Sequence, residues 1–258
     1  MPEQRNDMTS AETFVGGNRL MIVLVILAEV CGIISLVLLV DWLNEYYEGY
    51  SFDKDDSALF SYHPIFMYIG MIFLFGNSNI VFRFTRTIQI PKLIVKLLHG
   101  FVHALAILFI CLGTYTVARR KIVFGNNPMY SSHSWYGAAT IALFFIQYAF
   151  GVVAFVTPVL SESVKAKMLP LHRFLGAATF ILAFVTVMTG LTRINSFVER
   201  TTGKRYTEYP AWGTISNFFA VFTGVFVLLV MILVTNPAFK RQANKASSYK
   251  DEKVETQF

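Results

Sequence analysis

Two lysines and two histidines near the start of one apolar segment are the residues best suited to chemistry. Lys92, Lys96, His99 and His103 are separated by four, three and four positions, which puts all four side chains on one face of an α-helix. The lysines precede the apolar run, so the stripe passes from water into hydrocarbon. Ionisable side chains at membrane depth are costly and indicate a functional site, so the question is what these imidazoles hold.

The composition is that of a polytopic membrane protein. Of the 258 residues, 55% are hydrophobic and only 15% are charged, well below the charged share of a soluble domain. Six apolar runs are each long enough to span a hydrocarbon core of about 30 Å. They cover residues 20–40, 65–84, 97–117, 135–157, 171–190 and 215–234. The sequence therefore predicts an all-α membrane protein with six transmembrane helices.

The short connections and the lack of any motif at a fixed period predict a single membrane domain. Its expected bounds are 19–236, between a cytosolic N-terminal tail (1–18) and a cytosolic C-terminal tail (237–258). The first run is too long for a signal-peptide core, so we expect it to remain as an anchor. Cys31 and Cys111 lie inside apolar runs, which favours free thiols. With no CxxCH motif in the sequence, covalent c-type haem is excluded.

Loop charges predict the orientation. The loop of residues 41–62 carries six acidic residues and one lysine, whereas most of the 22 Lys and Arg residues flank the membrane on the side of the termini. The positive-inside rule therefore puts both termini in the cytosol. The basic cluster Arg119, Arg120 and Lys121, on the predicted outer side, argues against this orientation. Because the cations lie at helix ends rather than in one patch, the net charge does not indicate a nucleic-acid partner.

Four histidines sort into two pairs by predicted depth. His63 opens the second span and His133 the fourth, both at the outer face. His99 lies about two turns into the third span and His172 starts the fifth, both on the inner side. Helix bundles build cofactor sites from side chains on facing helices. Two histidines at matching depth can supply both axial ligands of a b-type haem, so each face has one candidate pair.

Haem is flat and wide, so small residues must lie beside its ligands, and its propionates need cations or hydroxyls at the membrane boundary. Small residues, which also allow helices to approach closely, follow the four histidines by four or seven positions: Gly137, Gly176, Gly70 and Ala106. Boundary residues suited to propionates are Arg83, Lys92, Tyr130 and Lys240. The combined pattern favours haem over isolated interfacial histidines.

Other interpretations of the histidines were weighed against haem. A single histidine at a membrane boundary is more often an interfacial residue than a ligand. Zinc needs ligands that converge at about 2 Å from one ion, and pairs at opposite faces do not supply them. A polytopic transporter or metal-ion carrier without haem is the alternative function, but such proteins usually have Gly- or Pro-broken helices at the midplane. A scaffolding protein would not need paired boundary histidines.

His99 and His103 compete for one ligand role, because they share a helix face. His99 is nearer the level expected for His172, so we expect His99 to be the ligand and His103 a packed, hydrogen-bonded core residue. Glu29, in the middle of the first span, is the other costly residue. It is either a protonated carboxyl that is hydrogen-bonded between helices or a group that accompanies electron movement with a proton.

At its histidine and lysine motifs, the chain resembles the cytochrome b561 family. Members of this family are ascorbate-dependent transmembrane electron carriers with six helices and two b haems. The similarity covers the second to fifth spans closely and the sixth more weakly. It rests on His63-Pro64 with Gly70, the Val-Phe-Arg run ending at Arg83, the Lys92-xxx-Lys96-Leu-Leu-His99-Gly run, the Met129-Tyr-Ser-Ser-His133-Ser-Trp135 run, Pro170-Leu-His172 with Gly176, and Thr235-Asn-Pro-Ala-Phe-Lys240. The lysine–histidine and His-Ser-Trp runs rarely coincide by chance.

The resemblance implies a four-helix bundle, made by the second to fifth spans, around two non-covalent haem b groups. His63 and His133 would be the axial ligands of the outer haem, and His99 and His172 those of the inner haem. Bis-imidazole ligation leaves no open iron position, which favours electron transfer over oxygen binding. One haem cannot reach both surfaces of a core about 30 Å thick, so two in series are the minimum.

The resemblance also implies an ascorbate site on the cytosolic side at Lys92 and Lys96. Arg83 and Lys240 would then lie near the propionates of the inner haem. Lys165 stands where close relatives carry an arginine that touches ascorbate. Its charge is kept, whereas the bidentate contact of an arginine is lost.

On the outer side, the resemblance puts Tyr130 and Ser131 in a segment, 128–131, that lines the outer haem. By spacing, Lys121 occupies the place of a histidine that contacts substrate in some ferric-reducing members, and Arg193, closing the fifth helix, stands where a relative has Glu. With the basic cluster at 119–121, Arg193 is expected to attract anions. The implied function is electron transfer from cytosolic ascorbate to monodehydroascorbate or a ferric chelate. Homodimers are common in the family, and the sequence does not decide between a vesicle, an endolysosomal and a plasma membrane.

Overall fold

The computed structural model describes the backbone of residues 2–53, 57–85, 90–125, 127 and 129–240, and their side chains from residue 18 onward. Six helical segments are long and apolar enough to cross a membrane. They are Asn18–Tyr46, Ser57–Phe84, Lys92–Val123, Ser132–Val156, Glu162–Thr202 and Ala211–Thr235. This confirms the predicted all-α class with six spans, in which each backbone polar group is satisfied within its own helix.

The spans are built from the following elements. The first is α1 (Pro2–Tyr46), and the second joins the 3-10 turn η1 (Ser57–Ser61), α2 (Tyr62–Met67), the π-helix η2 (Tyr68–Leu74) and α3 (Phe75–Phe84). Then follow α4 (Lys92–Val123), α5 (Ser132–Gly151) with the π-helix η4 (Val152–Val156), and α6 (Glu162–Thr202). The last are the 3-10 turn η5 (Tyr206–Glu208), α7 (Ala211–Thr235) and the 3-10 turn η6 (Pro237–Phe239).

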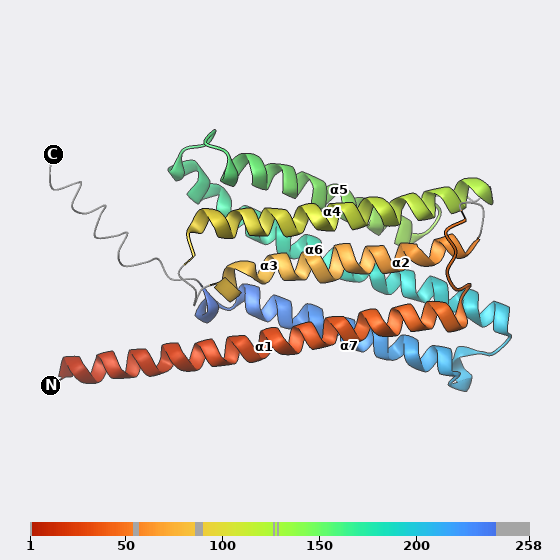
Figure 1. The fold of residues 1–258 in the computed structure, drawn as a ribbon, viewed down its shortest axis with the longest axis horizontal. Helices are drawn as coiled ribbons and strands as arrows, with labels where there is room; N and C mark the ends of the chain where they lie inside the picture. Colours follow the sequence, from red (N-terminus) through yellow and green to blue (C-terminus); the bar gives the residue numbers. More distant parts are fainter. Residues whose placement is uncertain (1, 54–56, 86–89, 126, 128, 241–258) are drawn as a thin grey trace.

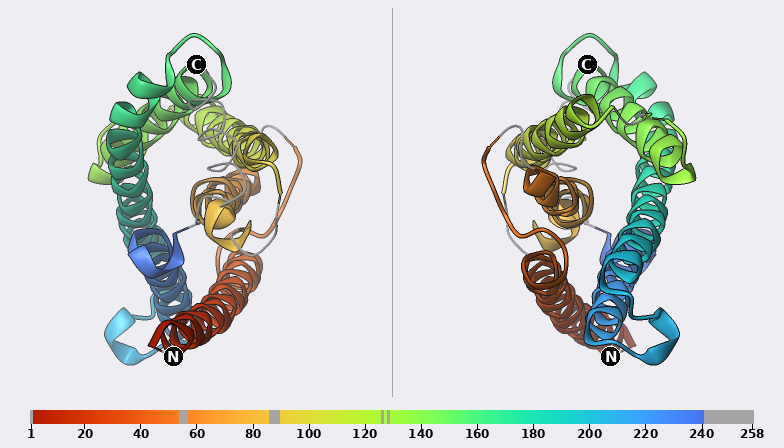
Figure 2. Two further views of the ribbon diagram at one scale, coloured as in Figure 1. Left: turned by 90° about the vertical axis from the view of Figure 1, so that its left-hand side faces the viewer. Right: turned by 90° about the vertical axis from the view of Figure 1, so that its right-hand side faces the viewer.

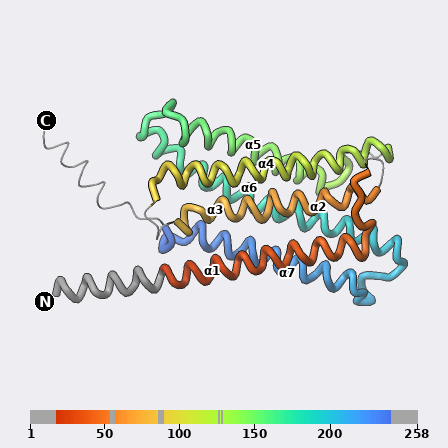
Figure 3. The backbone as a smooth tube through the Cα atoms, in the orientation of Figure 1, coloured from red at the N-terminus to blue at the C-terminus, as the bar shows by residue number. Residues whose placement is uncertain are grey.

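The helices run side by side along the long axis of the molecule (Figure 1). α1 packs against α7 and α5 against α6, while the second span packs on α4 and α7. Seen from the ends, α1 and α7 lie together on one side, α4 and α5 on the other, with the second span and α6 between them (Figure 2). Figure 3 shows that the short loops join consecutive helices at alternate ends of the bundle.

A hydrophobic core fills the space between α1, α7, the second span and α6. Its largest fully buried side chains include Tyr68, Phe180 and Phe226. Polar contacts add to this packing: the Trp42 indole donates to the Trp212 carbonyl at 2.7 Å. Many aliphatic side chains on the outward faces of the helices remain exposed, as expected where lipid is the solvent.

α6 is longer than its apolar run predicted. It extends from Glu162 to Thr202 and includes Pro170, because proline is tolerated in a membrane helix where neighbours satisfy the freed backbone groups. His172 therefore lies well inside α6 rather than at its start, and Arg193 does not close the helix. Gly203, with φ of 68°, ends it, in the left-handed conformation that favours glycine at a helix end.

The helices do not follow the expected domain bounds closely enough to test them. α1, as defined above, includes most of the predicted N-terminal tail (1–18). In the predicted C-terminal tail (237–258), residues 237–239 form η6, and residues 241–258 lie outside the described residues, as does Pro128 of the segment expected to line the outer haem. The bounds of the membrane domain stay a prediction.

Candidate functional site

Both histidine pairs come together between helices. His63 at the start of α2 and His133 at the start of α5 have ring centroids 6.2 Å apart, with planes inclined by 85°. His99 in α4 and His172 in α6 have centroids 6.5 Å apart, with planes inclined by 78°. The structure therefore brings together the residues that the depth argument paired.

The spacing within each pair fits one metal ion between two imidazoles. A ring nitrogen about 2 Å from a metal puts the ring centre about 3 Å from it, so two opposed imidazoles have centres about 6 Å apart. The observed separations of 6.2 and 6.5 Å match this value. Within the described residues, no group of three or more His, Cys, Asp and Glu side chains gathers around one point, so each pair is a candidate set of two ligands.

Three of these histidines are oriented by backbone carbonyls. His63 Nδ1 donates to the Gly113 carbonyl at 2.9 Å, and His133 Nδ1 donates to the Thr186 carbonyl at 2.9 Å. His99 Nδ1 donates to the Ser78 carbonyl at 2.8 Å and lies 3.0 Å from the Ser78 hydroxyl. With its proton on Nδ1, each ring presents the lone pair of Nε2, which is how proteins orient a metal-binding histidine.

His172 is positioned by packing. Its Nδ1 is buried, and no hydrogen-bond partner for it is present among the described residues. The Phe155 ring lies 5.1 Å from the imidazole and the Phe150 ring 6.1 Å, while Gln147 Nε2 donates to the His172 carbonyl at 3.0 Å. Among the described residues, this ligand candidate therefore differs from the other three because no carbonyl fixes its tautomer.

Two glycines that the sequence argument did not select make room for the imidazoles. A Cβ on Gly190 would lie 2.8 Å from His133 Cε1, and one on Gly151 would lie 3.3 Å from His172 Cε1. Neither follows a histidine by four or seven positions, so the spacing rule could not find them. Their only sequence signal is a glycine within an apolar run.

The four small residues that the spacing rule selected differ in the space around them. A Cβ on Gly137 would meet Thr186 Cγ2 at 3.6 Å and one on Gly176 would meet Gln147 Nε2 at 4.0 Å, so both leave space beside the histidines. A Cβ on Gly70, in contrast, would lie 2.9 Å from the Ala106 carbonyl oxygen. Gly70 and Ala106 therefore bring the second span against α4, and the expectation that they clear a haem surface was wrong.

His103 is packed as expected but lacks the expected hydrogen bond. Its ring lies 4.5 Å from that of His99 and meets Phe75 and Phe144 edge-on at 5.4 and 5.3 Å. Its Nδ1 is buried with no hydrogen-bond partner in the described part of the chain. Aromatic contacts, rather than polar ones, fix this imidazole.

One of the two carboxyl oxygens of Glu29 has a hydrogen-bond partner. Asn77 Nδ2 in α3 donates to Glu29 Oε2 at 3.4 Å, which joins α1 to the second span. The other carboxyl oxygen, Oε1, is buried without a hydrogen-bond partner in the described residues. The contact matches the first of the two alternatives, a carboxyl hydrogen-bonded between helices.

Predicted ascorbate-binding residues lie near the inner pair. Lys96 Nζ donates at 3.0 Å to the carbonyl of Phe155, whose ring packs on His172. Lys165 Nζ forms an ion pair of 2.9 Å with Glu162 Oε1, and Lys96 and the exposed Lys92 also act on this carboxylate electrostatically. Glu162, an acidic residue that the sequence argument missed, is therefore paired with Lys165 and feels the positive charges of Lys92 and Lys96.

The remaining inner candidates lie where the helices end. The Arg83 guanidinium donates to the Val234 carbonyl and so joins the end of α3 to the end of α7. Lys240 follows η6 and is exposed. Contact of either residue with a propionate stays a prediction.

An outer cationic cluster adjoins the outer pair. It consists of Lys121, Tyr130 and Arg193. The Arg193 guanidinium donates to the Tyr130 hydroxyl and lies 4.6 Å from the Tyr130 ring centre, and Lys121 Nζ lies 5.9 Å from the same centre. Both cations act electrostatically on His133. Ser131 caps α5 by accepting from the Ser134 backbone N–H at 3.3 Å, which helps to fix His133 at the helix start.

Arg120 does not join this cluster, contrary to expectation. It pairs with Glu48 at 3.5 Å, and its guanidinium lies 4.7 Å from the ring centre of Phe60. Phe60 in turn stacks on His63 at 5.4 Å. The charge of Arg120 is thus matched by a carboxylate, and its guanidinium lies against the ring that stacks on His63. Lys121 and Arg193 are the cations of the outer cationic cluster.

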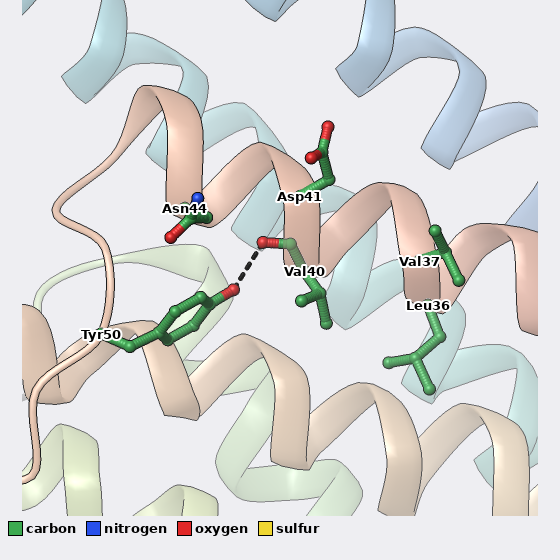
Figure 4. A pocket seen from close by; sticks show the side chains of 6 residues that line it. All are labelled: Leu36, Val37, Val40, Asp41, Asn44 and Tyr50. Atoms are coloured by element: carbon green, nitrogen blue, oxygen red, sulfur yellow. Dashed lines mark hydrogen bonds between the residues drawn. The ribbon is translucent and has the colours of Figure 1, made fainter.

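An open cavity of about 520 Å³ lies apart from these residues, on the surface of α1. It is lined by Leu36, Val37, Val40, Asp41, Asn44 and Tyr50 (Figure 4). Tyr50 donates to the Val40 carbonyl at 2.5 Å, and burial raises the pKa of this phenol to about 12, so it keeps the donated proton at neutral pH. None of the predicted site residues lines the cavity.

The fold makes the chain a multi-pass integral membrane protein, with two half-buried histidine pairs between its helices. Residues 62–198 match the profile of eukaryotic cytochrome b561. A lysosomal membrane ascorbate-dependent ferrireductase of Danio rerio is 33% identical over 219 residues, which cover 84% of this chain and 88% of the relative. A transmembrane ascorbate-dependent reductase of Bos taurus is 31% identical, covering 83% and 82%. A putative homologue of the same reductase in Caenorhabditis elegans is 28% identical, covering 86% and 85%.

The chain belongs to the cytochrome b561 family. The motifs quoted above had indicated this family, and the match confirms it. A b-type cytochrome binds haem without a covalent bond, so haem b is the implied cofactor. The paired imidazoles, with Nδ1 hydrogen-bonded in three of the four, fit such a group.

Proposed function

We propose that this protein transfers electrons across the membrane from cytosolic ascorbate, by way of two non-covalent haem b groups, to an acceptor at the opposite face. Family membership supports an oxidoreductase, and relatives are named ascorbate-dependent reductases. The observation that carries the proposal is the occurrence of two separate histidine pairs, each with the spacing that one iron needs between two imidazoles.

In this proposal, His63 with His133 would hold one haem and His99 with His172 would hold the other. When bound, each haem would supply a one-electron carrier ligated by imidazoles, which is suited to electron transfer. The chain fixes the ligand rings by carbonyl acceptors at His63, His133 and His99, and by the Phe155 and Phe150 contacts at His172.

Lys92, Lys96 and Lys165 form the proposed ascorbate site. Ascorbate is an anion at neutral pH, so the lysines attract and orient it beside the inner pair, and Glu162 limits the positive charge that they present. Lys96 is the central member, because its bond to the Phe155 carbonyl keeps its ammonium near His172. Ascorbate gives up one electron and loses a proton, which water at this exposed surface accepts.

The outer cationic cluster is the proposed exit. Lys121 and Arg193 lie beside His133 and favour an anionic acceptor, either monodehydroascorbate or a ferric chelate, and the Danio rerio relative is named a ferrireductase. Tyr130 and Ser131 would lie near the outer haem, and Arg83, Lys92 and Lys240 near the propionates of the inner one. The loop charges support cytosolic termini.

An absorbance measurement on the purified full-length protein tests the proposal. Ascorbate and then dithionite should each give a reduced-minus-oxidised spectrum of b type, and extraction should yield two haems per chain. A haem-free transporter would give no such spectrum. If the protein is colourless and takes up no added haem, the proposal fails.

Replacing Lys96 by Ala should weaken ascorbate binding without changing the haem spectrum. Loss of one charge-assisted contact is worth about 1.5 to 3 kcal/mol, so the ascorbate concentration at half-maximal reduction rate should rise at least about tenfold. Stopped-flow reduction by graded ascorbate measures it. Lys167, exposed on the same helix as Lys165, provides the matched control: Lys167→Ala should leave the concentration dependence unaltered. Equal behaviour of the two variants would exclude Lys96 from the site.

A further inference from the structure

The two helix carbonyls that accept from the outer histidines each also accept a hydrogen bond from a threonine hydroxyl, in addition to the backbone bond of the helix. The Gly113 carbonyl, which accepts from His63 Nδ1 at 2.9 Å, also accepts from Thr116 Oγ1 at 3.0 Å. The Thr186 carbonyl, which accepts from His133 Nδ1 at 2.9 Å, also accepts from Thr189 Oγ1 at 2.9 Å, and this hydroxyl is shared with the Val185 carbonyl at 3.1 Å. In both cases the threonine follows the carbonyl residue by three positions, on α4 and on α6.

Threonine hydroxyls commonly bond to carbonyls three or four residues back in a helix. Thr114, for example, donates to the Ile110 carbonyl at 2.7 Å, and Thr192 to the Met188 carbonyl at 3.1 Å. Neither of those carbonyls holds a histidine. What separates Thr116 and Thr189 from the others is that both bond to the oxygen that orients a ligand candidate, and that they do so on two different helices.

The inner pair lacks this arrangement. The Ser78 carbonyl that accepts from His99 Nδ1 has the hydroxyl of its own residue nearby, and this hydroxyl bonds to the His99 carbonyl at 3.0 Å. For His172 Nδ1 there is no acceptor among the described residues. The threonine pair therefore acts on one histidine pair only.

A shared carbonyl has a predictable effect on its histidine. The oxygen has two lone pairs, and a hydroxyl that donates to it draws electron density away from the imidazole N–H. A weaker acceptor at Nδ1 leaves the ring less anionic, so it gives less electron density to a metal at Nε2. Hydrogen bonding to a ligand tunes the potential of a bound metal in this way.

We propose that Thr116 and Thr189 are positioning residues that raise the reduction potential of the outer haem relative to the value its two histidines would give alone. The inference rests on the proposed function, because it needs a haem between His63 and His133. It assigns a part in electron transfer to two threonines that bond to the carbonyls beside the ligand candidates rather than to the imidazoles themselves. Raising this potential favours arrival of the electron at the outer side.

Replacement of each threonine by valine tests this inference, since valine keeps the shape and removes the hydroxyl. In a spectroelectrochemical titration of the purified dihaem protein, Thr116→Val and Thr189→Val should each lower one of the two midpoints. The equilibrium constant for reduction should fall about three- to tenfold, equal to about 30 to 59 mV for one electron. Thr116→Ser and Thr189→Ser keep the hydroxyl and should leave both midpoints in place.

Thr114→Val and Thr192→Val are the matched controls on α4 and α6, and neither should move a midpoint. Thr116 is only 4% exposed; if Thr116→Val does not fold, Thr189→Val at its partly exposed position carries the same test. Bound haem with unmoved midpoints, a rise in midpoint, or equal shifts for valine and serine would overturn the inference. Absence of haem from the unmodified protein would instead overturn the proposed function.

Discussion

His99→Ala should lose one of two haems and the rapid reduction by ascorbate, whereas His103→Ala should keep both haems. The two residues lie on one helix face with ring centroids 4.5 Å apart, but their surroundings differ. His99 is held by the Ser78 carbonyl and lies across from His172, while His103 is enclosed by Phe75 and Phe144. Only His99 has an orienting acceptor of the kind that metal ligands use.

The haem-to-protein ratio and the fast kinetic phase measure this difference. For His99→Ala the ratio should fall from two to one, and the fast phase with ascorbate should slow by more than about 100-fold, beyond the effect of losing an outer-shell partner. His103→Ala creates a cavity beside two aromatic rings and should lower thermal stability alone. If His103→Ala loses haem while His99→Ala keeps it, the ligand assignment is wrong.

Gly190→Ala should displace His133 and weaken or abolish haem binding at the outer pair. The added methyl carbon would lie 2.8 Å from His133 Cε1 and 3.1 Å from Nδ1, closer than van der Waals contact allows, so the ring must leave the Thr186 carbonyl. Loss of an orienting contact to a metal ligand typically costs about 10- to 100-fold in affinity. We expect the outer haem to be lost on purification while the inner haem and its reduction by ascorbate persist.

Gly224→Ala, in α7, is the matched control for this change. Its methyl carbon would approach no atom closer than Phe184 Cζ, at 3.7 Å, which is ordinary contact distance, so both haems should remain. Electron paramagnetic resonance of the ferric protein counts the two low-spin centres in each variant. A Gly190→Ala protein with two unchanged centres would show that His133 is not confined as the structure places it.

Hydrophobicity alone was enough to predict the spans. Runs of about 20 apolar residues have one stable form in hydrocarbon, because a helix satisfies its own backbone groups. The apolar runs also predicted a similar depth for His63 and His133, since each histidine lies where a run begins. The length of α6 did not follow, because hydropathy marks only the part of a helix that faces lipid.

Side-chain contacts between spans were predicted less well. η2 and η4 are π-helical, and a π turn shifts the phase of the residues that follow it. Gly70, within η2, packs on Ala106 instead of beside a haem surface. Arg120 was assigned to an anion-attracting face, but its partner Glu48 is far from it in sequence and becomes its neighbour only in the folded chain.

The sequence by itself determined the class of protein: six membrane spans, histidines at two depths, lysines where one span begins, and motifs that identify the family. These features depend on composition and on spacing within one helix, which local physics fixes. Only the tertiary structure decided which carbonyl orients each imidazole, which glycine makes room for it, and which cations stay beside it. Those contacts depend on the rotation and separation of neighbouring helices, which the spacing along one chain segment does not specify.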